Sequence, residues 1–268
     1  MRATLIHHQG FGDLFTNNSL CNFFSEKYDE LLILVQDEKR KKILDYVYHD
    51  NHKVKCEVVK TLNENKFNSC CINCMTLGNP LGCPKDGSNC IYVNYDEYPN
   101  YNHIKIGAFK ENYNEWDIFL KNNQSNGKSF SHSFYEYENL DLSVRINFFN
   151  LSRNKKIEEN KFSKLNLSEY IVLHDDKNRN KVINKEISDL KIYELNGSSD
   201  VFIDQIKILE NAKEIHFIDS SWSVLIYFLS FHNEKIKLIP KFLHCYLHND
   251  RDLEIYKNPI PENWNFIY

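Results

Sequence analysis

The chain has 268 residues, of which 42% are hydrophobic and 26% charged, a mix typical of a globular protein with one large domain or two small ones. Its formal net charge of -4 argues against the overall basic surface of a nucleic-acid-binding protein. There is no apolar run of about 18 residues and no signal-peptide core near the start, so we expect no membrane span and a cytoplasmic location. The abundance of Asn, Lys and Ile is typical of an AT-rich genome, such as that of a giant virus (hence host cytoplasm) or an AT-rich bacterium.

The first 60 residues alternate between predicted strands and predicted helices. Apolar runs predict strands at residues 3–8, 30–37 and 54–60, and helical spacing of apolar residues predicts helices at 16–29 and 38–50. This alternation indicates a parallel sheet with crossover helices. The basic run Lys39, Arg40, Lys41 and Lys42 is interpreted as a solvated face of the second helix.

Residues 69–90 have a different composition and predict an inserted loop. The segment is rich in Cys, Gly, Asn and Pro, and four of its cysteines could bind one structural zinc ion: Cys71, Cys74, Cys83 and Cys90. Only the first two have the paired Cys-x2-Cys spacing. Reduced loop cysteines and a disulfide are the alternatives, and a cytosolic setting disfavours the disulfide.

A second alternation of strands and helices follows. Strands are predicted at 169–176, 189–196 and 214–221 and within 235–244, and helices at 154–167, 200–212 and 222–231. We therefore predict an α/β protein with two Rossmann-like halves, residues 1–135 and 136–268, that face each other across a cleft. The tail after Asp250 either stays in the second half or crosses back to the first.

Ligands of open parallel sheets bind at the carboxyl ends of the strands, and the first such end carries "HHQGFGD". Gly10 and Gly12 permit close approach of a ligand to the backbone, and His8 and Asp13 supply polar groups. Asp13 is either a catalytic or substrate-binding carboxylate or merely a helix cap. The segment is not a complete dinucleotide fingerprint, because Phe15 stands where a third glycine is required.

Two strand ends in the second half carry further candidates. "YIVLHDDKNR" places His174 and Arg179 after a buried strand, where they could bind a phosphate or form only a charged turn. "IHFIDSSWSVLIYFL" predicts a strand that ends at Asp219 and a helix that begins with Ser220, Ser221 and Trp222. Free amides and hydroxyls at that helix start could bind an anion, unless Ser220 serves only as the cap.

A fourth segment, "SHSFYEYENLDLSVRINFF", carries Tyr135 and Arg145. Both could line the cleft between the halves. Core packing is the better interpretation of the aromatic residues of this segment.

The "GFGD" turn, the charged "HDDKNR" strand end and "IHFIDSS" before an apolar helix together resemble GT-B glycosyltransferases, closest to the heptosyltransferase-like and fucosyltransferase-like branches. The resemblance implies that Asp13 is the general base and that Asp219, Ser220 and Ser221 hold the donor diphosphate. It assigns His174 and Arg179 to the same diphosphate, although the spacing of Arg179 departs from the His-x-Arg pattern of the family.

The resemblance implies transfer of a sugar from a nucleoside-diphosphate sugar to a glycan-type hydroxyl acceptor, with inversion and without a catalytic metal ion or other cofactor. Two alternatives stay open: a nucleotide- or sugar-binding protein without turnover, and an interaction protein stabilised by zinc. No Walker-type lysine loop and no Gly-x-Ser-x-Gly elbow occurs in the sequence, which weighs against a P-loop enzyme and a serine hydrolase.

Overall fold

The computed structural model describes residues 1–7, 10–35, 37–59, 69–71, 92–106, 113–126, 128–166, 168–177, 180–184, 188–195, 202–245 and 253–268. The chain divides into two compact units, Met1–Ser152 and Arg153–Tyr268. The boundary predicted between residues 135 and 136 falls inside helix α6, Phe130–Tyr137. The first unit extends further because α7, Ser143–Asn147, packs against α2, Asn18–Lys27.

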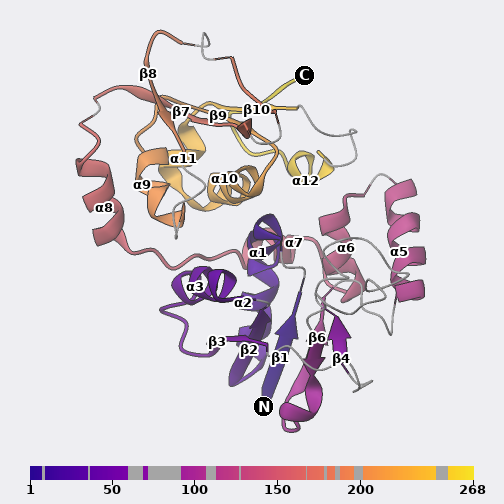
Figure 1. Ribbon diagram of the computed structural model, residues 1–268. Helices are drawn as coiled ribbons and strands as arrows, with labels where there is room; N and C mark the ends of the chain where they lie inside the picture. Colours follow the sequence, from indigo (N-terminus) through magenta and orange to yellow (C-terminus); the bar gives the residue numbers. More distant parts are fainter. Residues whose placement is uncertain are drawn as a thin grey trace. The chain divides into compact units, whose positions relative to one another are not determined.

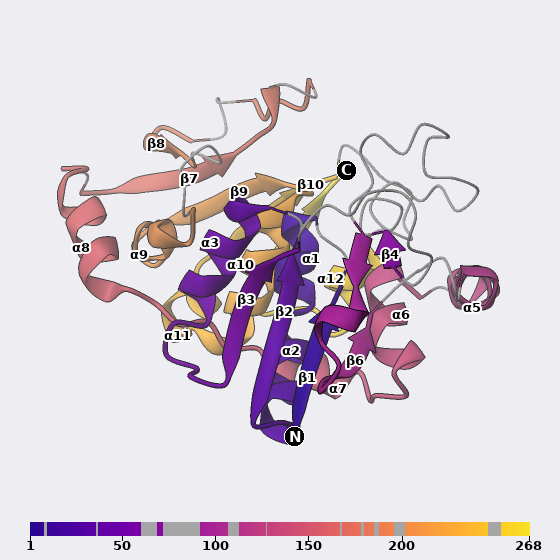
Figure 2. The same cartoon turned by 60° about the horizontal axis from the view of Figure 1, so that its bottom comes forward.

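The first unit contains a parallel four-stranded sheet with the order β3-β2-β1-β6 (Figure 2). Its strands are β1 (Arg2–Ile6), β2 (Glu30–Val35), β3 (Val54–Val58) and β6 (Asn102–Lys105). Residues 31–35 of β2 are all buried, as expected for a central strand of a parallel sheet covered on both faces. The three strands predicted for this half are therefore confirmed.

The first helix of the first unit begins earlier than the sequence predicted, whereas α3 (Glu38–Val47) begins at the predicted residue 38. The predicted helix 16–29 is two helices, α1 (Phe11–Thr16) and α2, which are separated at Asn17. The "GFGD" segment is thus the first turn of α1 rather than a loop before a helix. The other helices are α3, which packs against β2 and β3, and α5 (Tyr113–Ser125), which packs against α6.

Short strands close the base of the predicted insert. β4 (Ser69–Cys71) pairs in antiparallel fashion with β5 (Tyr92–Asn94), and a 3₁₀-helix at Tyr95–Glu97 follows. The backbone of Cys71 is part of β4, whereas Cys74, Cys83 and Cys90 lie outside the described residues. The zinc site therefore stays a prediction.

The second unit contains a parallel five-stranded sheet with the order β11-β10-β9-β7-β8. Its strands are β7 (Tyr170–His174), β8 (Lys191–Glu194), β9 (Glu214–Ile218), β10 (Lys241–His244) and β11 (Trp264–Ile267). The tail ends in this sheet, since β11 pairs with β10.

The helices of the second unit are α8 (Lys155–Ser163), α9 (Ile206–Leu209), α10 (Ser221–His232), α11 (Glu234–Leu238) and α12 (Glu254–Lys257), with a 3₁₀-helix at Phe202–Gln205. Figure 1 shows α9, α10 and α11 on one side of the sheet. The segment 235–244, predicted to supply only a strand, forms most of α11 and then β10.

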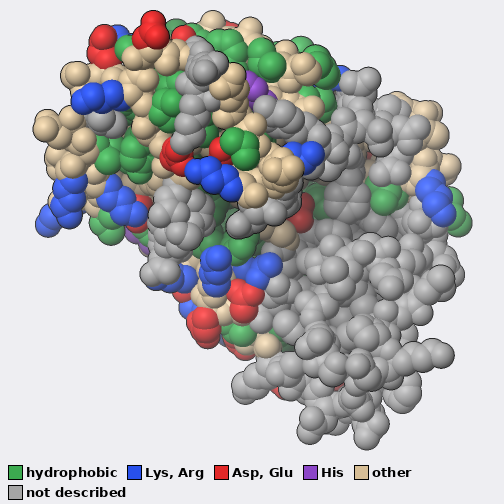
Figure 3. Space-filling model, turned by 45° about the horizontal axis from the view of Figure 1, so that its top comes forward, with side chains coloured by type: hydrophobic (Ala, Val, Ile, Leu, Met, Phe, Trp, Pro, Cys, Tyr) green, Lys and Arg blue, Asp and Glu red, His purple; other side chains and the backbone are tan. Residues whose placement is uncertain are grey.

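None of the helices among the described residues combines the length and apolar character needed to cross a bilayer. Figure 3 shows one face of the molecule, on which basic and acidic side chains both appear among hydrophobic ones.

Candidate functional site

The strand order of each sheet places the candidate residues at a point where the order reverses. In the first unit, β2 and β3 lie on one side of β1 and β6 lies on the other. In the second unit, β8 lies on one side of β7, and β9, β10 and β11 lie on the other. Crevices at such switch points, outside the carboxyl ends of the strands, are where open α/β sheets bind ligands. Asp13 follows β1 in the first unit, and His174 ends β7 and Asp219 follows β9 in the second unit.

Asp13 is held in the first turn of α1 by a close contact with Gly10. Gly10 is the N-cap of this helix, and its backbone amide hydrogen-bonds to the Asp13 carboxylate, as in one half of a capping box. A Cβ added at Gly10 would lie 2.6 Å from Asp13 Oδ2. The φ angle of Gly10 is an ordinary -63°, so a larger residue here would be opposed by the Asp13 carboxylate rather than by the backbone conformation.

The Asp13 carboxyl has a raised pKa. Burial raises its pKa to about 6, and the hydrogen bond from Gly10 lowers the pKa by less than burial raises it. A carboxylate of this pKa is mostly ionised at pH 7, yet it is a stronger base than an ordinary aspartate. The contact with Gly10 and the raised pKa belong to the same side chain, so the capping and catalytic interpretations are compatible.

Two basic residues of α3 lie over the ring of Phe11, next to this turn. Lys39 Nζ is 4.8 Å from the ring centroid and the Arg40 guanidinium carbon is 5.0 Å from it. Arg40 also pairs with Asp37, the N-cap of α3. Lys39 is exposed, as the interpretation of a solvated helix face predicted, whereas Arg40 is half-buried. Both cations also pack on the aromatic ring of Phe11.

The start of α10 in the second unit is a complete capping box. Ser220 Oγ accepts a hydrogen bond from the Trp222 amide at 3.2 Å, and the Ser220 amide donates to Ser223 Oγ at 2.8 Å. Ser220 is thus a helix cap, as its alternative interpretation predicted. The amide and hydroxyl of Ser221 make no hydrogen bond with the described residues, so they are the groups at this helix start that could bind an anion.

Tyr256 fixes the Asp219 carboxylate and was missed by the sequence analysis. Its hydroxyl donates to Asp219 Oδ1 at 2.6 Å and lies 2.8 Å from Ser223 Oγ. The side chain is 1% exposed, and burial together with Asp219 raises the pKa of Tyr256, so the phenol stays a proton donor. The signal available in the sequence was the pair of large aromatic residues in the tail, Tyr256 and Trp264.

His174 is half-buried, and its ring centroid lies 6.2 Å from that of Trp222. Trp222 was a candidate at the predicted anion-binding helix start, but it is 1% exposed and packs edge-on against Phe202 at 4.9 Å. Trp222 is therefore a core residue that packs near His174 and does not face a ligand. Asp176 and Lys181, which follow β7, exchange two main-chain hydrogen bonds of 2.8 Å.

Arg179 and His8 lie outside the described residues. Tyr135 and Arg145 are 0% and 1% exposed, inside the first unit. The Tyr135 hydroxyl donates to the carbonyl of Thr16, and the carbonyl of Arg145 accepts a hydrogen bond of 2.6 Å from Ser19. Core packing is therefore the role the structure gives both residues, and it joins α6 and α7 to α1 and α2.

The fold is similar to two solved glycosyltransferase structures along the whole chain. The glycosyl transferase family 9 protein from Veillonella parvula DSM 2008 superposes with a TM-score of 0.56 and 7% identity, over 99% of this chain and 86% of that one. The ADP-heptose LPS heptosyltransferase II of E. coli gives a TM-score of 0.54 and 10% identity, over 100% and 90%. The chain has a GT-B-like fold.

Sequence comparison gives no further assignment. No family model matches the chain, and no match was found among curated proteins. The GT-B-like resemblance is thus confirmed at the level of the fold.

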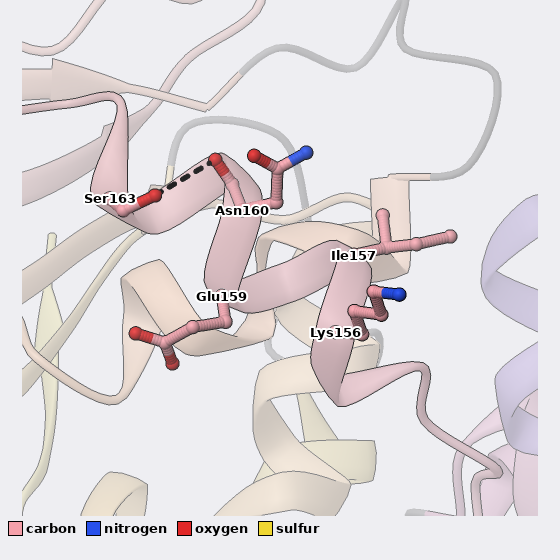
Figure 4. A pocket seen from close by; sticks show the side chains of 5 residues that line it. All are labelled: Lys156, Ile157, Glu159, Asn160 and Ser163. Atoms are coloured by element: carbon pink, nitrogen blue, oxygen red, sulfur yellow. Dashed lines mark hydrogen bonds between the residues drawn. The ribbon is translucent and has the colours of Figure 1, made fainter.

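Two further properties of the described residues concern metal ligands and cavities. Among these residues, no three His, Cys, Asp or Glu side chains are arranged to hold a metal ion. A cavity of about 640 Å³ lies along α8, and Figure 4 shows five side chains of that helix at its wall: Lys156, Ile157, Glu159, Asn160 and Ser163. Since this wall is one side of a surface helix, we assign no role to the cavity.

Proposed function

We propose that the protein is a glycosyltransferase that moves a sugar from a nucleoside-diphosphate sugar to a hydroxyl of a glycan or another acceptor. Two observations support the proposal: the fold likeness to two glycosyltransferases and the position of Asp13 at the switch point of the first sheet. The observation that carries it is the fold likeness, and the Asp13 carboxyl, whose pKa burial raises to about 6, fits the role of the base.

In the proposed reaction, Asp13 takes the proton of the acceptor hydroxyl. The acceptor oxygen forms a bond to the anomeric carbon of the donor sugar as the bond from that carbon to the diphosphate oxygen breaks. The nucleoside diphosphate leaves with the electron pair, and the configuration at the anomeric carbon inverts. A base of this kind contributes roughly 10²- to 10⁴-fold to a rate.

The second unit would hold the donor. We propose that the diphosphate binds to the amide and hydroxyl of Ser221 and to His174 and Arg179, which would balance the charge of the leaving group without a metal ion. Asp219 has a positioning role in this proposal, because Tyr256 holds its carboxylate beside the start of α10.

A thermal-shift panel tests the proposal. Wild type, Arg179→Ala and Ser221→Ala are heated with UDP, GDP, ADP, dTDP and CMP and with their sugar conjugates. A ligand that binds the folded state raises the melting temperature by mass action. We expect one nucleotide class to stabilise wild type and to stabilise both variants less. No shift from any nucleotide would contradict the donor site.

Turnover separates this proposal from a binding protein. We expect the donor that stabilises the protein most to be consumed when acceptors are supplied, and Asp13→Asn to bind that donor without consuming it. A donor that binds wild type but is never consumed with any acceptor would favour a nucleotide-sugar-binding protein instead.

A further inference from the structure

A pocket of about 380 Å³ lies in the first unit, within the size range of small-ligand sites. It is formed by the end of α2, the turn before β3 and the residues that follow α7. The residues before β2 and β3 lie at the amino ends of these parallel strands. The pocket therefore lies at the amino ends of the strands, whereas Asp13 lies at their carboxyl ends. It does not belong to the candidate site described above.

Hydrogen bonds to main-chain atoms hold the pocket in shape. Asn22 Nδ2 donates to the carbonyl oxygens of Phe148 at 3.0 Å and Asn150 at 3.2 Å. The Asn150 amide donates to Asn18 Oδ1 at 3.0 Å, and Lys53 Nζ donates to the carbonyl of Ser25 at 3.2 Å. The wall after α7 is thus fixed through its backbone, which leaves its side chains available.

Four polar side chains of the pocket wall are exposed and make no hydrogen bond with the described residues: Glu26, His52, Asn147 and Asn150. Each of the two amides offers both a donor and an acceptor, which matches hydroxyl groups that donate and accept at once. The half-buried ring of Phe148, held edge-on by Phe23 at 5.2 Å, supplies an apolar surface beside them.

The charges of the pocket disfavour a phosphate ligand. Its ammonium group, on Lys53, is already bonded to the carbonyl of Ser25, and Glu26 contributes a negative charge. A phosphate site would instead present several free cationic or amide donors. Uncharged hydroxyl groups on an apolar ring are the ligand chemistry that fits amides, a carboxylate and an aromatic side chain together.

We propose that this pocket binds a neutral sugar residue of a glycan, with Asn147, Asn150 and Glu26 hydrogen-bonded to its hydroxyls and Phe148 against its ring. The proposal stands on the chemistry of the pocket itself and does not depend on whether the chain transfers sugars. It gives the first unit a carbohydrate site separate from Asp13.

Saturation-transfer NMR tests this site with maltose, cellobiose, lactose and N,N′-diacetylchitobiose at about 10 mM, in the range of weak carbohydrate binding. We expect signals from at least one disaccharide and an affinity about tenfold lower for Asn147→Ala/Asn150→Ala, which loses two amides. This variant should fold, because the hydrogen bonds of Asn150 that hold the pocket use its backbone.

A matched control is Asn122→Ala/Asn126→Ala, which removes two exposed amides in the same unit, one in α5 and one directly after it. This control should bind the disaccharide as wild type does. No signal from any of the four sugars would overturn the proposal. Equal binding by wild type and Asn147→Ala/Asn150→Ala, with both melting at the same temperature, would also overturn it.

Discussion

The two switch points of this molecule treat their carboxylates differently. Asp13 lies against Gly10, and burial outweighs the main-chain hydrogen bond that favours its ionised form. Asp219 accepts a hydrogen bond from the buried phenol of Tyr256 and lies 3.3 Å from Ser223 Oγ. The first arrangement raises the basicity of a carboxylate, whereas the second fixes the orientation of one. The comparison teaches that two aspartates at similar strand ends can differ in their surroundings: burial raises the pKa of Asp13, whereas a buried phenol orients Asp219.

The sharpest test of this contrast is Asp13→Asn. We expect donor turnover to fall by roughly 10²- to 10⁴-fold, because the amide cannot take the acceptor proton. We also expect a gain in unfolding free energy of about 1–2 kcal/mol at pH 8. The pKa of this carboxyl is higher in the folded protein than in the unfolded chain. Its ionisation therefore destabilises the folded state fully above pH 6, and this destabilisation disappears below about pH 4.

Urea denaturation of wild type and Asp13→Asn at pH 8 and pH 4 measures this gain. The gain should be seen at pH 8 and be absent at pH 4. An equal difference at both pH values would mean that burial does not raise the pKa of Asp13.

Gly10→Ala tests the contact between Gly10 and the Asp13 carboxylate. The added methyl group would lie within 2.6 Å of Asp13 Oδ2, so the side chain must move, at a cost of roughly 1–3 kcal/mol. The cost should shrink when Asp13 is also replaced by alanine, and a double-mutant cycle measured by denaturation gives the coupling. Additive effects of the two substitutions would show that the contact is not the source of the cost.

Tyr256→Phe tests the positioning of Asp219. Loss of the buried hydroxyl should lower the unfolding free energy by about 1–2 kcal/mol and weaken nucleotide binding in the thermal-shift panel. Tyr227→Phe is the control, since its hydroxyl donates to the carbonyl of Pro259 instead. If both variants weaken nucleotide binding equally, Tyr256 has no special role at the start of α10.

Each unit also holds a buried histidine that makes stability depend on pH. Burial, with a smaller effect of Arg145, lowers the pKa of His132 to about 3, and burial together with His216 lowers the pKa of His244 to about 4. The unfolded chain therefore binds these protons first as the pH falls below about 6.5. Stability should fall by up to about 1.4 kcal/mol per pH unit for each histidine down to pH 4.

Denaturation midpoints between pH 6.5 and 4.5 check this slope, and His132→Gln and His244→Gln should each flatten it. A slope that neither variant changes would assign the pH dependence to other groups.

The strands were predictable because their signal is local. No tertiary contact is needed to recognise the continuous apolar run of residues 31–35 in β2. The same holds for the apolar stretch of helix α10. The start of α1 was not predictable, because Gly10 caps the helix through the hydrogen bond from its amide to Asp13 and not through a helix propensity. Asp13 was chosen as a candidate because it follows the carboxyl end of a predicted strand. Its raised pKa depends on burial, which cannot be read from the sequence.

The missed features depend on contacts between residues far apart in the chain. Tyr256 is 37 residues from the aspartate it orients. The boundary after Ser152 depends on α7 packing against α2, including a hydrogen bond between Ser19 and Arg145 across 126 residues. Composition changes along the sequence do not mark either contact.

The pH dependence of kcat/KM for the donor selected by the nucleotide panel tests the central claim most directly. If Asp13 is the base, log kcat/KM should rise with a slope of one below about pH 6 and be level above it, as its carboxyl ionises. A profile with no break between about pH 5 and 7 would contradict the assignment of Asp13 as the base.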